Sequence, residues 1–314
     1  MRPYAGIWGI MAMRLRKKIS IGAKKLRNIT TFIRRLLKSK TEVRQTLHNG
    51  TGHPGCDLLL RDDELRQAYE RYKLYRPPEL SYATVGDYCD SMDHLRNLAI
   101  INHDLKDVQR PWVFKAVLGN IKPGAKLIEI GAGEPHVANL LTRMGYEVWV
   151  VDPYDGCGNG PTEYEHFKNK YPGIHFLRQY FSDTAPGLDP GAFDGIYSIS
   201  VLEHIPLEAI QGVFKGIRRF LRTHGGLTIH AIDHVHRGAG ADGHLGKLQT
   251  IMTELEISHS TLQKIISDLE DDPETYFLSA YGHNLWRGNK PYADFPMRRC
   301  VSINICKSIT AENE

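Results

Sequence analysis

Short β-branched runs alternate with helical segments from Gly124 onward, and this pattern leaves few folds open to the chain. The runs are four to seven residues long, whereas the segments between them place apolar residues three and four apart. Strands that alternate with helices predict a parallel sheet covered by helices on both faces. The predicted strands are 126–130, 147–152, 174–177, 194–200 and 227–232.

The segments on either side of this region complete the predicted fold. Helices are expected before it, at 63–75, 92–103 and 108–118. After it, 274–281 and 298–305 predict two more strands, paired as an antiparallel hairpin at the sheet edge. The predicted fold class is therefore α/β, with a doubly wound, mostly parallel, seven-stranded sheet and an added N-terminal helical region.

The chain divides into three expected regions. Residues 1–56 comprise a basic arm and a linker whose Gly and Pro content disfavours both helix and strand. Residues 57–120 form a helical region that is expected to act as a lid, with Tyr82, Tyr88 and His94 as candidate lining residues. Residues 121–314 form the domain that contains the sheet.

The charge of the chain is divided unevenly between the arm and the rest. Residues 1–42 hold 12 Lys or Arg and one acid, a net charge of +11. The remaining chain holds 28 basic and 35 acidic residues, a net charge of −7. The negative net charge of residues 43–314 argues against a nucleic-acid partner.

The arm also carries apolar residues at helical spacing, which predicts a basic amphipathic helix. One interpretation is a helix that lies on an anionic membrane surface. The alternatives are a solvated extension, a start codon placed too far upstream and an organelle transit peptide. The apolar stripe consists of Leu26, Ile29, Phe32, Ile33, Leu36 and Leu37.

Cysteine usage and hydropathy indicate the compartment. The five cysteines are scattered and form no C-x-x-C pair, which is typical of a reducing compartment. No run reaches the 18 apolar residues of a membrane span. The expected location is the cytoplasm, with the arm as a peripheral contact to the inner face of the membrane.

The segment 127–136 is the most informative about chemistry. A predicted strand carries Glu129 near its end and turns through Gly131 and Gly133 into a helix that begins near Pro135. Glycines let a ligand approach the backbone closely, and a helix amino terminus favours negative groups. The next strand ends 21 residues after Gly131, on Asp152, where a carboxylate can accept both hydroxyls of a ribose. These features predict a site for a nucleoside-like cofactor.

Two cofactors compete for such a site. A dinucleotide fingerprint needs a third glycine where this chain has His136, which weakens the nicotinamide interpretation. The acid Glu129 can meet the ammonium of an amino-acid moiety, which suits S-adenosylmethionine.

The chain resembles the class I S-adenosylmethionine-dependent methyltransferases over residues 124–305. The resemblance rests on Glu129, Gly131 and Gly133, on Asp152, and on the segment 193–206 after the fourth strand. Pro135 departs from the family, which often has a third glycine there. The implied fold is the Rossmann-like methyltransferase fold. The implied cofactor-binding residues are Glu129, Gly131, Ala132, Gly133, Asp152, Pro153, Ser182, Asp183, Ser200 and Val201, with Ser182 and Asp183 at the adenine.

The methyl acceptor is expected at the carboxyl ends of the strands, because the cofactor lies there. Asp233 and His234 are candidates for an orienting acid and a base, and His204 is expected above the cofactor. The alternative is a divalent metal bound by Asp233, His236, Asp242 and His244, but their spacing matches no specific ligand pattern and no metal is expected. In the segment 281–288, the side chains of Asn284, Trp286 and Arg287 suit a sugar or another polyhydroxyl compound.

The expected function is S-adenosylmethionine-dependent methylation of an oxygen on a small molecule or a sugar or glycan acceptor. The alternatives are an RNA or protein methyltransferase and a non-catalytic S-adenosylmethionine-binding scaffold. The negative net charge of residues 43–314 argues against RNA as the substrate. The fourth strand is also not followed by an Asn-Pro-Pro-aromatic segment, which is the signal for methylation of amino groups on bases.

Overall fold

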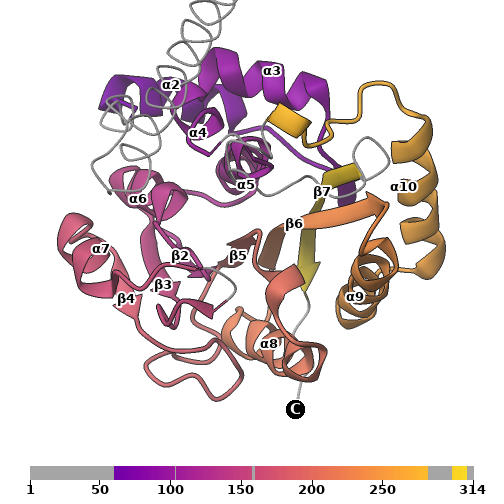
Figure 1. The fold of residues 1–314 in the computed structure, drawn as a ribbon. Coiled ribbons are helices and arrows are strands. Elements are labelled where there is room, and N and C mark those ends of the chain that lie inside the picture. Colours follow the sequence, from indigo (N-terminus) through magenta and orange to yellow (C-terminus); the bar gives the residue numbers. More distant parts are fainter. Residues whose placement is uncertain (1–59, 103, 158–159, 282–298, 310–314) are drawn as a thin grey trace, which may run out of the picture. The chain divides into compact units, whose positions relative to one another are not determined.

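The computed structural model describes residues 60–102, 104–157, 160–281 and 299–309 of the chain (Figure 1). The predictions for the arm and linker at 1–56, and those for Asn284, Trp286 and Arg287, lie outside these residues. Leu59–Glu314 form one compact unit, and the description below concerns that unit.

A seven-stranded sheet organises the unit, with the strand order β1-β7-β6-β5-β2-β3-β4. β2 to β6 run parallel to their neighbours among themselves, β7 is antiparallel to β6, and β1 is antiparallel to β7. This confirms the predicted fold class. The strands are β1 (Leu80–Tyr82), β2 (Lys126–Ile130), β3 (Glu147–Val151), β4 (His175–Leu177), β5 (Gly195–Ile199), β6 (Gly226–Arg237) and β7 (Arg299–Ile309).

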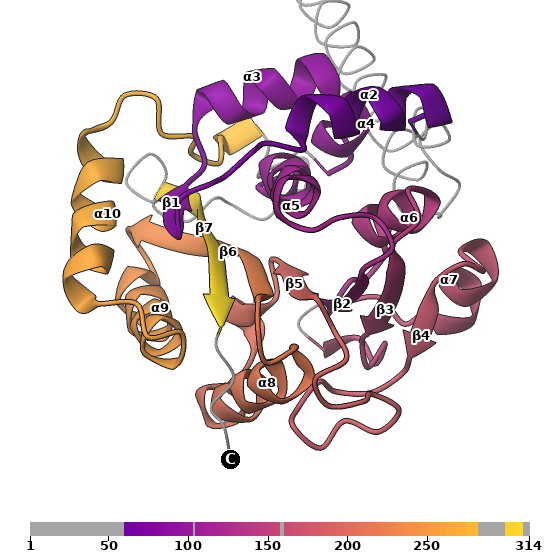
Figure 2. The same cartoon turned by 180° about the vertical axis from the view of Figure 1, so that it is seen from behind.

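Helices cover both faces of the sheet (Figures 1 and 2). One apolar core lies between the sheet and α2 (Asp62–Tyr72), α4 (Arg96–Ala99), α5 (Lys106–Asn120), α6 (His136–Arg143) and α7 (Tyr164–Lys170). A second lies between the opposite face and α8 (Leu207–Phe220), α9 (Ala241–Glu254) and α10 (His259–Asp271). The remaining helices are α3 (Val85–His94) and the 3-10 turn η2 (Leu202–His204).

The local sequence explains most of these elements. β5 is buried at all five of its residues, as expected for a central strand covered on both faces. α8 buries Ile210, Val213, Phe214 and Ile217, which are three and four residues apart and so lie on one face of the helix. None of the helices in the described segments is long and apolar enough to span a lipid bilayer.

Two predictions about the elements are wrong. The predicted helix at 92–103 is interrupted at Leu95, where the backbone leaves the helical region and the side chain is buried in the core between α3 and α4. The segment 274–281 is no strand, because only Thr275 and Phe277 form isolated bridges. β7 therefore lies inside the sheet, and the edge beside it is β1, a three-residue strand too short to show a periodic pattern.

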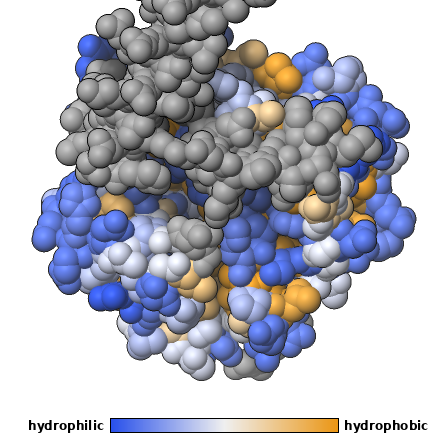
Figure 3. Space-filling model, in the orientation of Figure 1, coloured by the Kyte–Doolittle hydropathy of each residue, from blue (hydrophilic) through white to orange (hydrophobic). Residues whose placement is uncertain are grey.

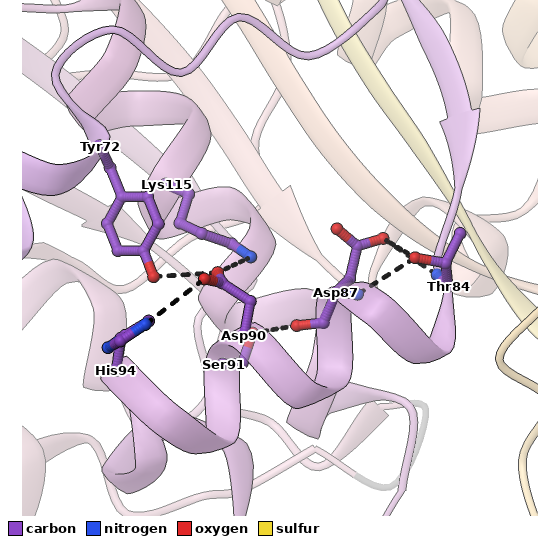
Figure 4. A network of polar contacts seen from close by, with 7 residues as sticks. All are labelled: Tyr72, Thr84, Asp87, Asp90, Ser91, His94 and Lys115. Atoms are coloured by element: carbon purple, nitrogen blue, oxygen red, sulfur yellow. Dashed lines mark hydrogen bonds and ion pairs between the residues drawn. The ribbon is translucent and has the colours of Figure 1, made fainter. Parts of the chain in front are cut away.

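An ion pair between the buried Lys115 and the partly exposed Asp90 links α2, α3 and α5 (Figure 4). Nζ of Lys115, a residue only 2% exposed, donates to Oδ2 of Asp90 at 3.0 Å. The hydroxyl of Tyr72 donates to the same oxygen at 2.9 Å. Burial favours the neutral form of Asp90, but Lys115 and Tyr72 stabilise the anion and hold the pKa of this carboxyl below its usual value. Polar contacts of Asp90, as well as apolar packing, therefore hold α2, α3 and α5 together.

Candidate active site

The strand order places a crevice at the carboxyl ends of β2 and β5. The chain runs from β2 outward through β3 to β4, and then returns to the other side of β2 for β5 and β6. The connections after β2 and β5 therefore lead in opposite directions along the sheet. The gap between these two strands is a topological switch point, where open α/β sheets bind their ligands. The segments 131–135 and 200–206 follow these two strands, so they border the crevice that this topology predicts.

Gly131 shapes the turn after β2. Its φ of +65° lies in the left-handed region, and its N–H donates to the carbonyl of Val151 at 2.9 Å. A β-carbon at this position would lie 2.8 Å from both Cγ atoms of Val201. Only glycine fits, for reasons of both conformation and space.

Asp152 follows β3 and is held by two backbone donors. Gly133 donates to Oδ2 at 3.0 Å, and Tyr154 donates to Oδ1 at 2.8 Å. The residue is 8% exposed, and burial raises the pKa of its carboxyl although both N–H groups favour the anion. The hydroxyl of Tyr154 donates to the carbonyl of Gly133 at 2.9 Å, so the loops after β2 and β3 form one rigid rim. Each carboxylate oxygen keeps a further lone pair for a ribose hydroxyl.

Glu129 lies beneath the turn at the end of β2. It is 3% exposed and accepts a hydrogen bond from the Tyr197 hydroxyl at 3.0 Å. Burial raises the pKa of Glu129 to about 7, although Tyr197 and the backbone N–H of Ala138 favour the anion. A carboxyl of this kind can be neutral when alone and ionised opposite an ammonium group.

Arg110 adds a positive charge beside Glu129 that the sequence analysis missed. This residue of α5 is buried, and its Nη1 donates to Oδ1 of Asn102 at 2.8 Å. Its charge lowers the pKa of Glu129 and, after burial itself, is the next cause that lowers the pKa of His136 to about 3. Glu129 and Arg110 together offer an anion and a cation, which complement the amino and carboxylate groups of an amino-acid moiety.

The predicted adenine residues follow β4. The N–H of Asp183 donates to the carbonyl of Gly212 in α8 at 3.2 Å, and the hydroxyls of Ser182 and Thr184 lie 3.1 Å apart. Ser182 and Asp183 are half-buried, as are the predicted cofactor residues Ala132 and Pro153 on the crevice rim.

Asp233 is the centre of a polar network at the ends of β5 and β6. Ser200 donates to its Oδ2 at 3.2 Å, and Nε2 of Gln109 donates to its Oδ1 at 2.8 Å. Nζ of Lys106 donates in turn to Oγ of Ser200 at 3.0 Å. Ser200 has a φ of +55°, a strained value for a residue with a side chain and one that is common at functional sites. Lys106 and Gln109 come from the first turn of α5 and were missed, because both are polar and apolar periodicity does not identify polar residues, even in a helix that is buried on nearly all sides.

Two further carboxyls border Asp233. Oε1 of Glu203 accepts from the N–H of Asp233 at 3.0 Å, while its Oε2 is buried and has no hydrogen-bond partner in the described part of the chain. Burial and the charge of Asp233 raise the pKa of Glu203 to about 8. Burial also raises the pKa of Asp104, and the Asp233 charge adds to that rise.

Residues 102–255 match a family profile described as a methyltransferase domain. This segment, just under half of the chain, is similar to a methyltransferase domain. The match and the observed fold confirm the resemblance to the class I S-adenosylmethionine-dependent methyltransferases, and with it S-adenosylmethionine as the cofactor. The match begins at 102 and so includes α5, which precedes the segment that carried the resemblance.

Solved structures are similar to this chain at low sequence identity. The YcgJ protein from Bacillus subtilis is 15% identical, with 65% of this chain and 99% of that chain covered and a TM-score of 0.43. Geranyl diphosphate C-methyltransferase from Streptomyces coelicolor is 13% identical, with 79% and 98% covered and a TM-score of 0.41. A TehB-like methyltransferase from Corynebacterium glutamicum is 16% identical, with 71% and 99% covered and a TM-score of 0.38. No sequence among the curated proteins matches with significance.

The structure does not bring the side chains of Asp233 and His234 together as an acid and a base. Neighbouring residues of a strand point to opposite faces, so Asp233 faces α5 whereas His234 faces the other core. His234 is 2% exposed, and its ring centroid lies 6.3 Å from that of His236 and 6.4 Å from that of His244. Burial, followed by these two histidines, lowers the pKa of His234 to about 3. By contrast, His204 lies exposed at the end of η2.

The metal alternative has no matching cluster in the methyltransferase. Among residues 60–281 and 299–309, apart from the undescribed positions 103 and 158–159, no three His, Cys, Asp or Glu side chains are arranged to hold a metal ion. Asp233, His236, Asp242 and His244 therefore do not form such a group.

Proposed function

We propose that this methyltransferase holds S-adenosylmethionine across the ends of β3, β2 and β5, and transfers its methyl group to a small-molecule acceptor at the ends of β5 and β6. The observation that carries the proposal is the rigid rim formed by Gly133, Asp152 and Tyr154 beside the turn at Gly131. Asp152 would hold the ribose, and Glu129 with Arg110 would hold the amino-acid end.

The protein's part in the reaction is alignment and proton transfer. When bound, S-adenosylmethionine supplies an electrophilic methyl group on a positively charged sulfur. Holding both reactants in line is worth up to ~7–11 kcal/mol of the barrier. Asp233, fixed by Gln109 and Ser200, is placed to accept the proton of an acceptor hydroxyl, and His204 is the second candidate. His234 is not proposed as the base, because its side chain is buried on the face of β6 opposite to that of Asp233.

An oxygen of a small molecule or a sugar is the acceptor that we propose, with the helical region before Gly124 as its lid. The first turn of α5 supports that role for the helical region, since it supplies Lys106, Gln109 and Arg110 to the crevice. The part of the face in Figure 3 that is not grey is mostly hydrophilic and carries an apolar patch below its centre.

Cofactor binding and turnover test the proposal in two steps. Isothermal titration should show binding of S-adenosylmethionine and S-adenosylhomocysteine to the wild type. Asp152→Asn should weaken both at least tenfold with the fold intact, because the charge-assisted bonds to the ribose are lost. Release of S-adenosylhomocysteine with a panel of hydroxylated small molecules then identifies the acceptor. Binding without release for every acceptor class would leave a scaffold as the better description.

The location of the protein is a separate proposal that rests on sequence. We propose a cytoplasmic protein whose residues 1–42 contact anionic membrane surfaces, given their net charge of +11 and their apolar stripe. Flotation with acidic vesicles at low and high salt tests this, with a truncation that begins at Asp57 as the control. Full-length protein that ignores acidic vesicles at low salt would refute it.

A further inference from the structure

α9 turns back against the end of β6 directly after that strand. The connection between them consists of residues 238–240 alone. Gly238 and Gly240 have φ values of +85° and +90° there, in the left-handed region that glycine adopts without strain. The first turns of α9 therefore pack beside η2 and beside the part of β6 that carries Asp233.

Lys247 of α9 binds the backbone on both sides of His204. Its Nζ donates to the carbonyl of Glu203 at 3.0 Å and to the carbonyl of Ile205 at 2.5 Å. Carbonyls at the end of a helical turn have no partner within that turn, and a lysine ammonium group can satisfy them. One charged group therefore fixes the backbone position of His204, the second candidate for the base.

His244, one turn earlier in α9, holds the first candidate. Its Nδ1 lies 3.1 Å from the carbonyl oxygen of Asp233, and because a carbonyl only accepts, the ring nitrogen donates. His244 and Lys247 are three residues apart, so they lie on the same face of the helix. We name these two residues the α9 clamp.

The two segments that the clamp holds are also joined to each other. Oε1 of Glu203 accepts from the N–H of Asp233 at 3.0 Å. Val201, which precedes η2, meets the turn at Gly131. A shift of η2 would therefore displace both candidate bases relative to the proposed cofactor site. A misplacement of about 1 Å can cost roughly 10²-fold in rate.

α9 is anchored at its other end as well. Nη1 of Arg218 in α8 donates to the carbonyl of Glu254 at 3.0 Å, and Nη2 donates to Oε2 of the same residue at 3.1 Å. Glu254 is the last residue of α9, whereas His244 and Lys247 lie in its first half. The clamp is therefore carried by a helix that is itself fixed to its neighbour.

We propose that Lys247 and His244 are positioning residues of the methyl transfer, which act from α9 to hold His204 and Asp233 in fixed positions at the acceptor side. This inference rests on the proposed function. The contacts through which both residues act are made to backbone carbonyls, so neither is a catalytic residue. Their loss should therefore lower the rate of transfer more than it weakens binding of the cofactor.

Hydrogen exchange of the backbone tests the clamp without any acceptor. In full-length Lys247→Met, peptides that contain residues 201–206 should exchange at least tenfold faster than in the wild type, because two carbonyls lose their donor. Lys247→Arg keeps a cationic donor and should restore slow exchange. The matched control is Arg218→Met, which removes a similar pair of bonds at the other end of α9 and should leave the exchange of 201–206 unchanged.

Turnover tests the positioning role. The acceptor is the hydroxylated small molecule with which the wild type releases S-adenosylhomocysteine fastest. Lys247→Met should lower kcat at least tenfold and keep the KM for S-adenosylmethionine within threefold of the wild type, and Lys247→Arg should recover most of kcat. His244→Leu should act in the same direction, and His244→Asn should restore the rate, because its amide can replace Nδ1 as the donor. The two sites give independent tests if one variant fails to fold.

Three results would overturn the inference. One is unchanged exchange of 201–206 in Lys247→Met, and another is an equal increase in Arg218→Met. The third is an unchanged kcat in clamp variants that keep the circular dichroism of the wild type. A wild type that binds no S-adenosylmethionine, or that releases no product with any acceptor, would instead overturn the proposed function, and the exchange experiment would still decide whether Lys247 holds η2.

Discussion

Gly131 and Val201 touch across the crevice, since a β-carbon on Gly131 would lie 2.8 Å from both Cγ atoms of Val201. This contact joins the turn after β2 to the loop after β5, the two segments that border the proposed cofactor site. The close approach explains why glycine is required here for space as well as for its positive φ.

Gly131→Ala should therefore destabilise the protein and abolish tight cofactor binding. The left-handed backbone costs an alanine roughly 1–2 kcal/mol, and overpacking against Val201 adds roughly 1–3 kcal/mol. The matched control is Gly145→Ala, because Gly145 has a φ of +88° and open space around it. Thermal unfolding should show the larger loss for Gly131→Ala, and Val201→Ala should restore part of it. Equal losses at the two glycines would disprove the steric argument.

Arg110→Met should weaken only those ligands that carry an amino-acid moiety. Loss of a charge-assisted hydrogen bond costs about 1.5–3 kcal/mol, which is roughly 10- to 150-fold in affinity. S-adenosylmethionine and S-adenosylhomocysteine should both lose that affinity, whereas 5′-methylthioadenosine, which lacks the amino-acid end, should bind unchanged. Isothermal titration measures all three, and Lys122→Met at an exposed position is the control. A parallel loss for 5′-methylthioadenosine would mean that Arg110 acts on the fold.

Glu129 should make cofactor binding depend on pH. Its pKa of about 7 in the free protein means that it is largely protonated at pH 6, whereas an ammonium partner requires the anion. Binding of S-adenosylmethionine should therefore release a proton at pH 6 and almost none at pH 8, and affinity should fall as the pH falls below 7. Titration at pH 6 in buffers of different ionisation enthalpy measures the proton. Glu129→Gln should bind more weakly but without this dependence.

The same shift has a consequence for the stability of the free protein. The folded-state pKa of Glu129 lies above the ordinary value near 4.3, so the unfolded state binds fewer protons between the two values. The contribution of this group to stability is therefore greatest below about pH 4 and is lost as the pH rises toward 7. Glu129→Gln should remove that loss, so the variant should gain thermal stability relative to the wild type more at pH 7.5 than at pH 5.

Asp90→Ala should cost more stability than Lys115→Met, although both break the same ion pair. Removing Asp90 leaves Lys115, which is 2% exposed, without its counter-charge, at a cost of about 3–5 kcal/mol. Removing Lys115 leaves Asp90, which is about a third exposed and can be hydrated. The double variant should be close to Lys115→Met alone. Urea unfolding of the four proteins measures the coupling, and additive losses would contradict the model of a buried, uncompensated cation.

The sequence by itself determined the parallel sheet and predicted the residues that we propose for the cofactor. The predicted strands at 126–130, 147–152 and 194–200 correspond to β2, β3 and β5, because buried central strands carry their signal in consecutive apolar residues. Glu129, Gly131 and Asp152 could be recognised because each stands at a strand end or in a turn, where the chain itself dictates the geometry. These are local features, and a local pattern is enough to find them.

Only the tertiary structure brought together the residues that we propose for the acceptor side. Lys106 and Gln109 lie in a helix that precedes β2, and nothing in their spacing indicates that they meet Ser200 and Asp233. The separation of Asp233 from His234 follows from the pairing of β6, which assigns each residue to one face of the sheet. The edge strand β1 likewise exists only through its pairing with β7, more than 200 residues away. Contacts between distant segments depend on packing of the whole unit, and periodicity within one segment carries no information about its partner.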